Sequence, residues 1–214
     1  MKMIILVCAA ISLLAGLACG GGSNEPEVVR VPIHRLNFDG MELTLEDLND
    51  LPFADAYPAI VAEVNGEPIS GQALAQRQVM QELSRRDAST ISEELFRDQM
   101  LANIESIDPL EKLIDDALQR QAIERLGLRA SDEEAVEYAK THEASVTQPR
   151  ATVSLEAYRQ IVSNMKFERE ACPTATAAFP LTPGVNFRGS PACDEFLRKE
   201  REDAEIVYYV VWAD

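Results

Sequence analysis

The chain has 214 residues, 46% hydrophobic and 26% charged, which suits one ordinary domain with an appendage and excludes two large domains. Asp and Glu number 36 against 20 Lys and Arg, and the net charge of −16 would repel a phosphate backbone, so we expect no nucleic-acid partner. Two histidines and four cysteines leave little material for a metal cage or a histidine-based catalytic centre, and we expect neither a metal nor a cofactor.

The N-terminus has the pattern of an export signal. Lys2 precedes an apolar run that ends in small residues, which predicts a signal peptide over residues 1–18. The sequence Leu-Ala-Gly-Leu-Ala-Cys at residues 14–19 resembles the lipobox of bacterial lipoproteins, which implies that Cys19 becomes an acylated, for example palmitate-bearing, N-terminus. A plain secretory signal cleaved nearby and an uncleaved anchor helix are the alternatives. In each case we expect the rest of the chain in the cell envelope, outside the cytoplasm, and acylation would make it a membrane-anchored lipoprotein.

Two strands are expected to frame the domain. Residues 19–57 are predicted to be a flexible acidic stalk because they lack periodic apolar residues, so the domain should span 58–214. Its first strand, at 60–64, ends in Asn65-Gly66, a dipeptide that suits the two positive φ angles of a tight turn. The last run, at 206–212, is β-branched and aromatic on both faces, as in a strand covered on both sides. We expect these strands to pair as a small two-stranded sheet.

Helices are predicted between the two strands, which makes the fold class mainly α. The clearest helix has Asp108 as its N-cap and Pro109 at its first position, and it ends before Gly127. Ser131 and Glu134 form a capping box for the next helix. Further helices are expected to begin near residues 70, 92, 155 and 191.

Cys172 and Cys193 are expected to form a disulfide. With Cys8 in the signal and Cys19 acylated they are the remaining thiols, and a lone pair in an exported protein most simply forms a bond. The residues between them are rich in Pro and Gly, so the segment 172–193 is predicted to be a loop closed by this bond. A redox pair is the alternative, although the close C-x-x-C spacing is missing.

No catalytic residue is predicted. The sequence contains no G-x-S-x-G, H-E-x-x-H, P-loop or G-x-G-x-x-G motif. Neighbouring carboxylates such as Asp115 and Asp116 point apart on a helix, so they indicate a solvated face.

The order of the elements resembles the N-terminal chaperone domain of SurA-type and PrsA-type foldases. The similarity is carried by four runs, namely residues 61–70 (VAEVNGEPIS), residues 113–115 with 121–122, residues 126–128, and residues 131–134 (SDEE). The resemblance implies a helical bundle that holds unfolded or nascent envelope proteins on hydrophobic surfaces. Many members carry a parvulin prolyl-isomerase domain after this one, and the residues up to Asp214 leave no room for it, so we do not expect an enzyme.

The leading hypothesis is therefore a lipid-anchored, chaperone-like module that binds unfolded exported polypeptides in an apolar groove between helices. Flexible methionine and large apolar side chains adapt to varied clients. The candidate client-binding residues are Met80, Leu83, Phe96, Met100 and Ile104, for each of which ordinary core packing is the alternative. An accessory lipoprotein that docks one folded partner, and a remnant peptidyl-prolyl isomerase, are the other hypotheses.

Overall fold

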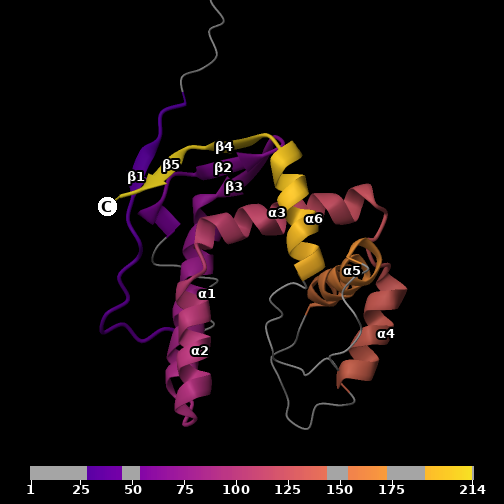
Figure 1. The fold of residues 1–214 in the computed structure, drawn as a ribbon, viewed down its shortest axis with the longest axis horizontal. Coiled ribbons are helices and arrows are strands. Elements are labelled where there is room, and N and C mark those ends of the chain that lie inside the picture. The colour runs from indigo at the N-terminus through magenta and orange to yellow at the C-terminus, as the bar shows by residue number, and fades with distance from the viewer. Residues whose placement is uncertain (1–27, 45–53, 144–153, 173–190, 214) are drawn as a thin grey trace, which may run out of the picture.

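The computed structural model describes residues 28–44, 54–143, 154–172 and 191–213, and it is mainly helical with small sheets at one end (Figure 1). The predicted signal peptide and Cys19 lie outside these residues. The helices are α1 (Gly71–Ser89), α2 (Glu94–Glu105), α3 (Pro109–Arg125), α4 (Asp132–Glu143), α5 (Leu155–Ala171) and α6 (Pro191–Asp203), with a short 3-10 helix η2 (Ala54–Ala56). The strands are β1 (Val31–Ile33), β2 (Ile60–Val64), β3 (Glu67–Ser70), β4 (Ile206–Tyr208) and β5 (Val210–Trp212). The predicted mainly α fold class is confirmed.

Local capping chemistry starts the helices where the sequence predicts. The carboxylate of Asp108 accepts hydrogen bonds from the backbone N–H groups of Leu110 and Glu111, at 2.8 and 3.0 Å. Ser131 and Glu134 exchange two bonds, since each side chain accepts from the backbone N–H of the other, at 2.8 and 3.2 Å. These contacts satisfy N–H groups that have no partner inside a helix, so α3 and α4 begin at fixed residues.

The first and last strands of the predicted domain do pair. β2 lies antiparallel to β4, with Ala62 opposite Tyr208, and antiparallel to β3 on its other side, so the sheet has three strands where we expected two. The β2–β3 turn places Asn65 and Gly66 at φ values of 52° and 79°, as the Asn-Gly pair predicts.

A second small sheet differs from our expectation. β1 pairs in parallel with β5, and Ile33 in β1 is only 4% exposed, although it falls in the segment that we expected to be a flexible stalk. The last run is also two strands instead of one, and Val211 is 39% exposed, so β5 is not covered on both sides. Residues 28–44 therefore belong to the folded body.

Helix α3 crosses the molecule (Figure 1), and two hydrophobic clusters lie along it. The larger cluster joins the sheets, α1 and the first half of α3, and its buried members include Val61, Val64, Leu74, Val79, Ile114, Leu118 and Val210. The smaller cluster joins the end of α3 to α5 and α6 through Ala122, Ile123, Leu128, Phe167, Cys172 and Cys193. Thus α3 connects the sheet end of the molecule to the α4–α5 end.

The predicted disulfide pairs the end of α5 with the start of α6. The Sγ atoms of Cys172 and Cys193 are 2.10 Å apart and both residues are buried. Beside them the rings of Phe167 and Phe196 meet edge to face, with centroids 5.2 Å apart. Residues 173–190, the predicted Pro-rich loop, lie outside the described part of the chain.

Candidate functional site

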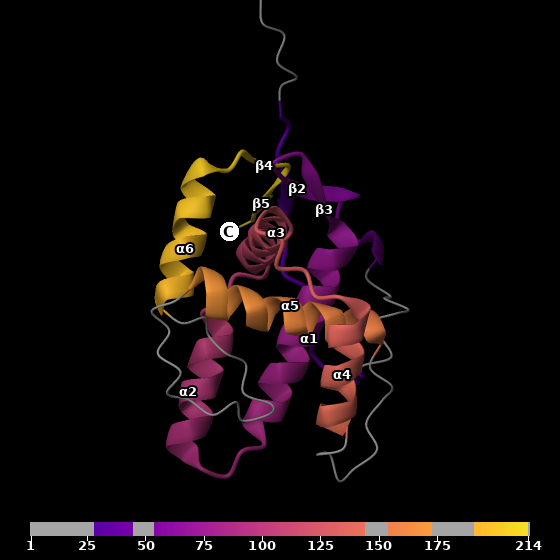
Figure 2. The same cartoon turned by 90° about the vertical axis from the view of Figure 1, so that its right-hand side faces the viewer.

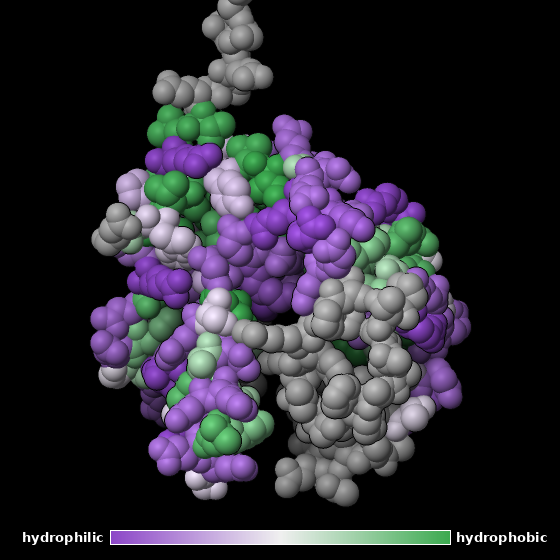
Figure 3. Space-filling view, in the orientation of Figure 1, coloured by the Kyte–Doolittle hydropathy of each residue, from purple (hydrophilic) through white to green (hydrophobic). Residues whose placement is uncertain are grey.

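The helices α1 and α2 form an arm that extends away from the sheets (Figures 1 and 2). No residue of α2 is buried, although the helix contains five large apolar side chains. Leu95 is 71% exposed and Phe96 is 50% exposed, and hydrophobic residues reach the surface of the arm among polar ones (Figure 3). Since isolated large apolar groups gain by leaving water, this arm can bind an apolar partner.

The structure distributes the five predicted client-binding residues between surface and core. Met80 is 40% exposed, while Met100 and Ile104 are half-buried on α2. Leu83 packs against the larger cluster, which is the core alternative stated above. All five residues therefore lie on α1 or α2, with different degrees of exposure.

Leu95 is the exposed residue that sequence reasoning missed. The predicted stripe on α2 follows the period of a helix and contains Phe96, Met100 and Ile104. Leu95 lies about 100° around the helix from Phe96, so it falls outside that stripe. The position of this apolar residue outside the stripe was the available signal, because a helix that packs on one side only does not bury a residue there.

The arm is fastened at one end of α2. The side-chain amide of Gln81 on α1 donates to the carbonyl oxygens of Ile104 and Ile107, at 2.7 and 3.0 Å, which satisfies acceptors at the C-terminal end of α2. At the other end, the N-cap residue Glu93 makes no side-chain capping bond. The exposed Leu95 and Phe96 therefore lie at the uncapped end.

A segment of the N-terminal region, residues 34–41, lies across α1, and we call it the strap. Buried Gln78, which is 5% exposed, accepts from the backbone N–H of Leu36 at 2.9 Å and donates to the Tyr57 hydroxyl. That hydroxyl donates to the carbonyl oxygen of His34 at 3.0 Å. Burial raises the pKa of Tyr57, so the hydroxyl keeps its proton and remains a donor.

Arg86 holds the other end of the strap. Its guanidinium donates to the carbonyl oxygens of Phe38 and Met41, at 3.0 and 2.7 Å, and to Glu82 at 2.7 Å. Hydrogen bonds from Arg85, together with those from Arg86, outweigh burial and lower the pKa of Glu82, so this carboxylate stays ionised and fixes both guanidinium groups.

A pocket of about 190 Å³ remains between the strap and the fastened end of α2. Leu36 and Phe38 of the strap form one wall, and Ile104 contributes to the other. The remaining lining residues are Arg35, Gln78, Gln81, Glu82, Arg85, Glu105 and Pro109. The strap therefore leaves the groove on α1 partly unfilled.

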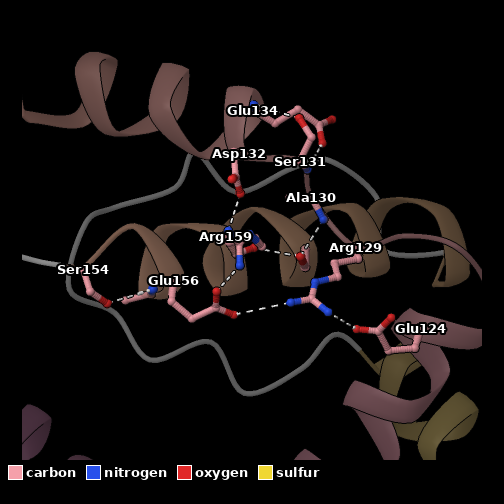
Figure 4. Close-up of polar contacts among 11 residues, drawn as sticks. Glu124, Arg129, Ala130, Ser131, Asp132, Glu134, Ser154, Glu156 and Arg159 are labelled. Carbon is pink, nitrogen blue, oxygen red and sulfur yellow. Dashed lines mark hydrogen bonds and ion pairs between the residues drawn. The ribbon is translucent and has the colours of Figure 1, made fainter.

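At the opposite end of α3, a polar network fastens α4 to α5 (Figure 4). Arg159 on α5 forms ion pairs with Asp132 and Glu156. The hydroxyl of buried Ser163 accepts from the backbone N–H of Ala130 at 2.8 Å and donates to the carbonyl oxygen of Arg159 at 2.7 Å. Because both bonds go to the backbone, Ser163 has no base to activate it, and the network is structural.

In residues 28–44, 54–143, 154–172 and 191–213, no three His, Cys, Asp or Glu side chains are arranged to hold a metal ion. No helix within the same ranges combines the length and the apolar character needed to cross a bilayer.

These features define a mainly helical domain with an apolar arm. The chain belongs to the family of SurA-like N-terminal domains, whose model matches residues 47–172, more than half of the chain. The resemblance noted from the sequence is thereby confirmed. No curated protein and no solved structure matches the chain. In general, SurA-like N-terminal domains bind unfolded polypeptides and are periplasmic or envelope-associated.

Proposed function

We propose that this protein is a chaperone-like module of the cell envelope that binds unfolded or nascent exported polypeptides on the α1–α2 arm. The observation that carries the proposal is the exposure of Leu95 and Phe96 on a helix with no buried residue. An apolar surface of this kind covers the exposed side chains of a client and removes both from water. Met80 on α1 and Met100 on α2 add to the arm flexible side chains that adapt to clients of different shape.

The charge of the chain fits this role. A net charge of −16 keeps the protein and a bound client apart from other copies by repulsion, which opposes aggregation.

The proposed anchor is a lipid on Cys19. Several acyl chains on one residue bind a membrane firmly, because each buried methylene contributes about 0.8 kcal/mol. Cys19→Ser should move the protein from the membrane fraction to the soluble fraction and abolish incorporation of labelled palmitate. Palmitate incorporation that survives this substitution would contradict the assignment.

An aggregation assay tests the binding function. The purified protein should suppress light scattering from a reduced, unfolded substrate, and the double variant Leu95→Ser/Phe96→Ser should lose most of that activity. The matched control is Val136→Ser/Ile161→Ser, which removes two apolar side chains that are 37% and 39% exposed on α4 and α5. Equal suppression by the two double variants would refute the arm as the binding surface.

A pull-down from envelope extract separates the proposal from the docking alternative. A heterogeneous set of proteins, lost in Leu95→Ser/Phe96→Ser, supports client binding. One stoichiometric folded partner would instead support an accessory lipoprotein.

A further inference from the structure

The strap is held mainly through its backbone. Tyr57, Gln78 and Arg86 bind four main-chain groups of the strap, two carbonyl oxygens near Arg86, one carbonyl oxygen at Tyr57 and one N–H at Gln78. Two of these groups, the carbonyl oxygens of Phe38 and Met41, are at the ends of a turn in which the N–H of Met41 donates to Phe38 at 3.1 Å and Gly40 has a φ of 70°. Side chains that bind main-chain groups recognise a peptide with little dependence on its other side chains. The groove on α1 therefore holds polypeptide mainly through main-chain groups.

The groove lies within the part of the chain that matches the family, and the strap lies outside it. Tyr57, Gln78 and Arg86 all lie inside the family match at 47–172, whereas the strap at 34–41 lies before it. The strap also fills the groove incompletely, because the pocket of about 190 Å³ separates Leu36 and Phe38 from the end of α2. The binding groups thus belong to the family domain, and the strap is a separate segment that occupies them.

The composition of the occupying segment indicates which chemistry the groove accepts. The strap, residues 34–41, contains one basic residue, Arg35, and one acidic residue, Asp39, so these charges cancel. Arg35 lies over the ring of Trp212, with its guanidinium carbon 5.5 Å from the ring centroid. Leu36 and Phe38 supply apolar side chains that pack against the larger cluster. A segment with apolar side chains and balanced charge is what this surface holds.

We propose that the groove on α1 is a second binding site for an apolar stretch of client polypeptide, and that the strap occupies it as an intramolecular stand-in. This inference rests on the proposed function and adds to the arm a site that binds the client backbone. A tethered segment competes at an effective concentration in the millimolar range, so the strap raises the apparent Kd of any client stretch that needs the same groups.

The probe is a labelled synthetic peptide with the sequence of residues 28–41, and its binding is measured by fluorescence anisotropy. Leu36→Ser/Phe38→Ser weakens the strap and leaves the groove groups unchanged, so this variant should bind the peptide at least about tenfold more tightly than the unmodified protein. Asn37→Ser, an exposed position between the two, is the control and should bind like the unmodified protein. Equal Kd values for the three proteins would overturn the inference.

A chemical change in the peptide tests recognition of the backbone directly. Methylating the peptide nitrogen that corresponds to Leu36 removes the donor to Gln78 and should weaken binding about fivefold. Unchanged binding of the methylated peptide would overturn main-chain recognition.

Hydrogen exchange on the unmodified protein gives a readout that does not depend on the folding of a variant. Saturating peptide should displace the strap and accelerate exchange of the Leu36 amide, whose N–H otherwise bonds to Gln78. Unchanged exchange at saturation would refute displacement. Because the aggregation assay with Leu95→Ser/Phe96→Ser probes the arm alone, failure of the strap inference and failure of the chaperone function can be told apart.

Discussion

Asp108 connects the start of α3 to the last strand of the chain, and its removal should cost stability in two separable parts. One carboxylate oxygen caps α3 through the N–H groups of Leu110 and Glu111, and the other accepts from the indole N–H of Trp212 at 2.8 Å. Loss of an N-cap costs about 1 kcal/mol, and loss of a charged acceptor for a partly buried N–H costs about 1–2 kcal/mol. Asp108→Ala should therefore lower the free energy of unfolding by about 2–3 kcal/mol.

Asp108→Asn separates the two parts, because its carbonyl oxygen still caps the helix while its NH₂ group cannot accept from the indole. This variant should lose only about 1–2 kcal/mol in urea unfolding followed by circular dichroism. Trp212→Phe completes a double-mutant cycle that measures the coupling between residues 108 and 212. A coupling energy near zero, or equal losses for Asp108→Ala and Asp108→Asn, would refute the reasoning.

Three further perturbations follow from contacts described above. Ser163→Ala leaves the buried N–H of Ala130 without its acceptor and should lower the free energy of unfolding by about 1–3 kcal/mol in urea; a loss below about 0.5 kcal/mol would contradict this. Glu82→Gln should be most destabilising above pH 4.5, the ordinary pKa of Glu82, because hydrogen bonds from Arg85 lower that pKa in the folded state. The difference in free energy of unfolding between this variant and the unmodified protein should shrink as the pH falls through the lowered pKa. A difference independent of pH would argue against this reasoning. Replacing both Cys172 and Cys193 with serine should lower the free energy of unfolding by about 3 kcal/mol relative to the oxidised protein. If reduction of the unmodified protein leaves its free energy of unfolding unchanged, a stabilising disulfide is excluded.

The helices were predictable because their signals are local. Asp108 with Pro109, and Ser131 with Glu134, satisfy backbone groups within one helical turn, so neighbouring residues alone determine where α3 and α4 begin. The Asn65-Gly66 turn is equally local, and both residues have the positive φ angles that it predicts. The pairing of β2 with β4 also followed from the sequence, because few other strand candidates were available.

The parts that were missed depend on partners distant in the chain. β1 has three residues and one of them is Pro32, so no local pattern distinguishes it from a linker; its strand geometry comes from β5, with Val31 opposite Val210. The strap was missed for the same reason, because its main-chain groups bond to the side chains of Tyr57, which follows η2, and of Gln78 and Arg86 on α1. The 50% exposure of Phe96 could not be predicted either, because a sequence pattern shows which face of a helix is apolar but not whether another element covers it.

The absence of buried residues in α2 has a consequence for the motion of the arm. A helix opens locally at a free-energy cost set by what it buries, so α2 should exchange its amide protons far faster than α3, whose Ile114 and Leu118 are almost fully enclosed. The two helices would then respond differently to a client, because α2 can shift, fray or re-form at little cost in free energy while α3 keeps its shape. Under the proposed function, a flexible α2 beside a rigid α3 would let the protein bind clients of different sizes without itself unfolding.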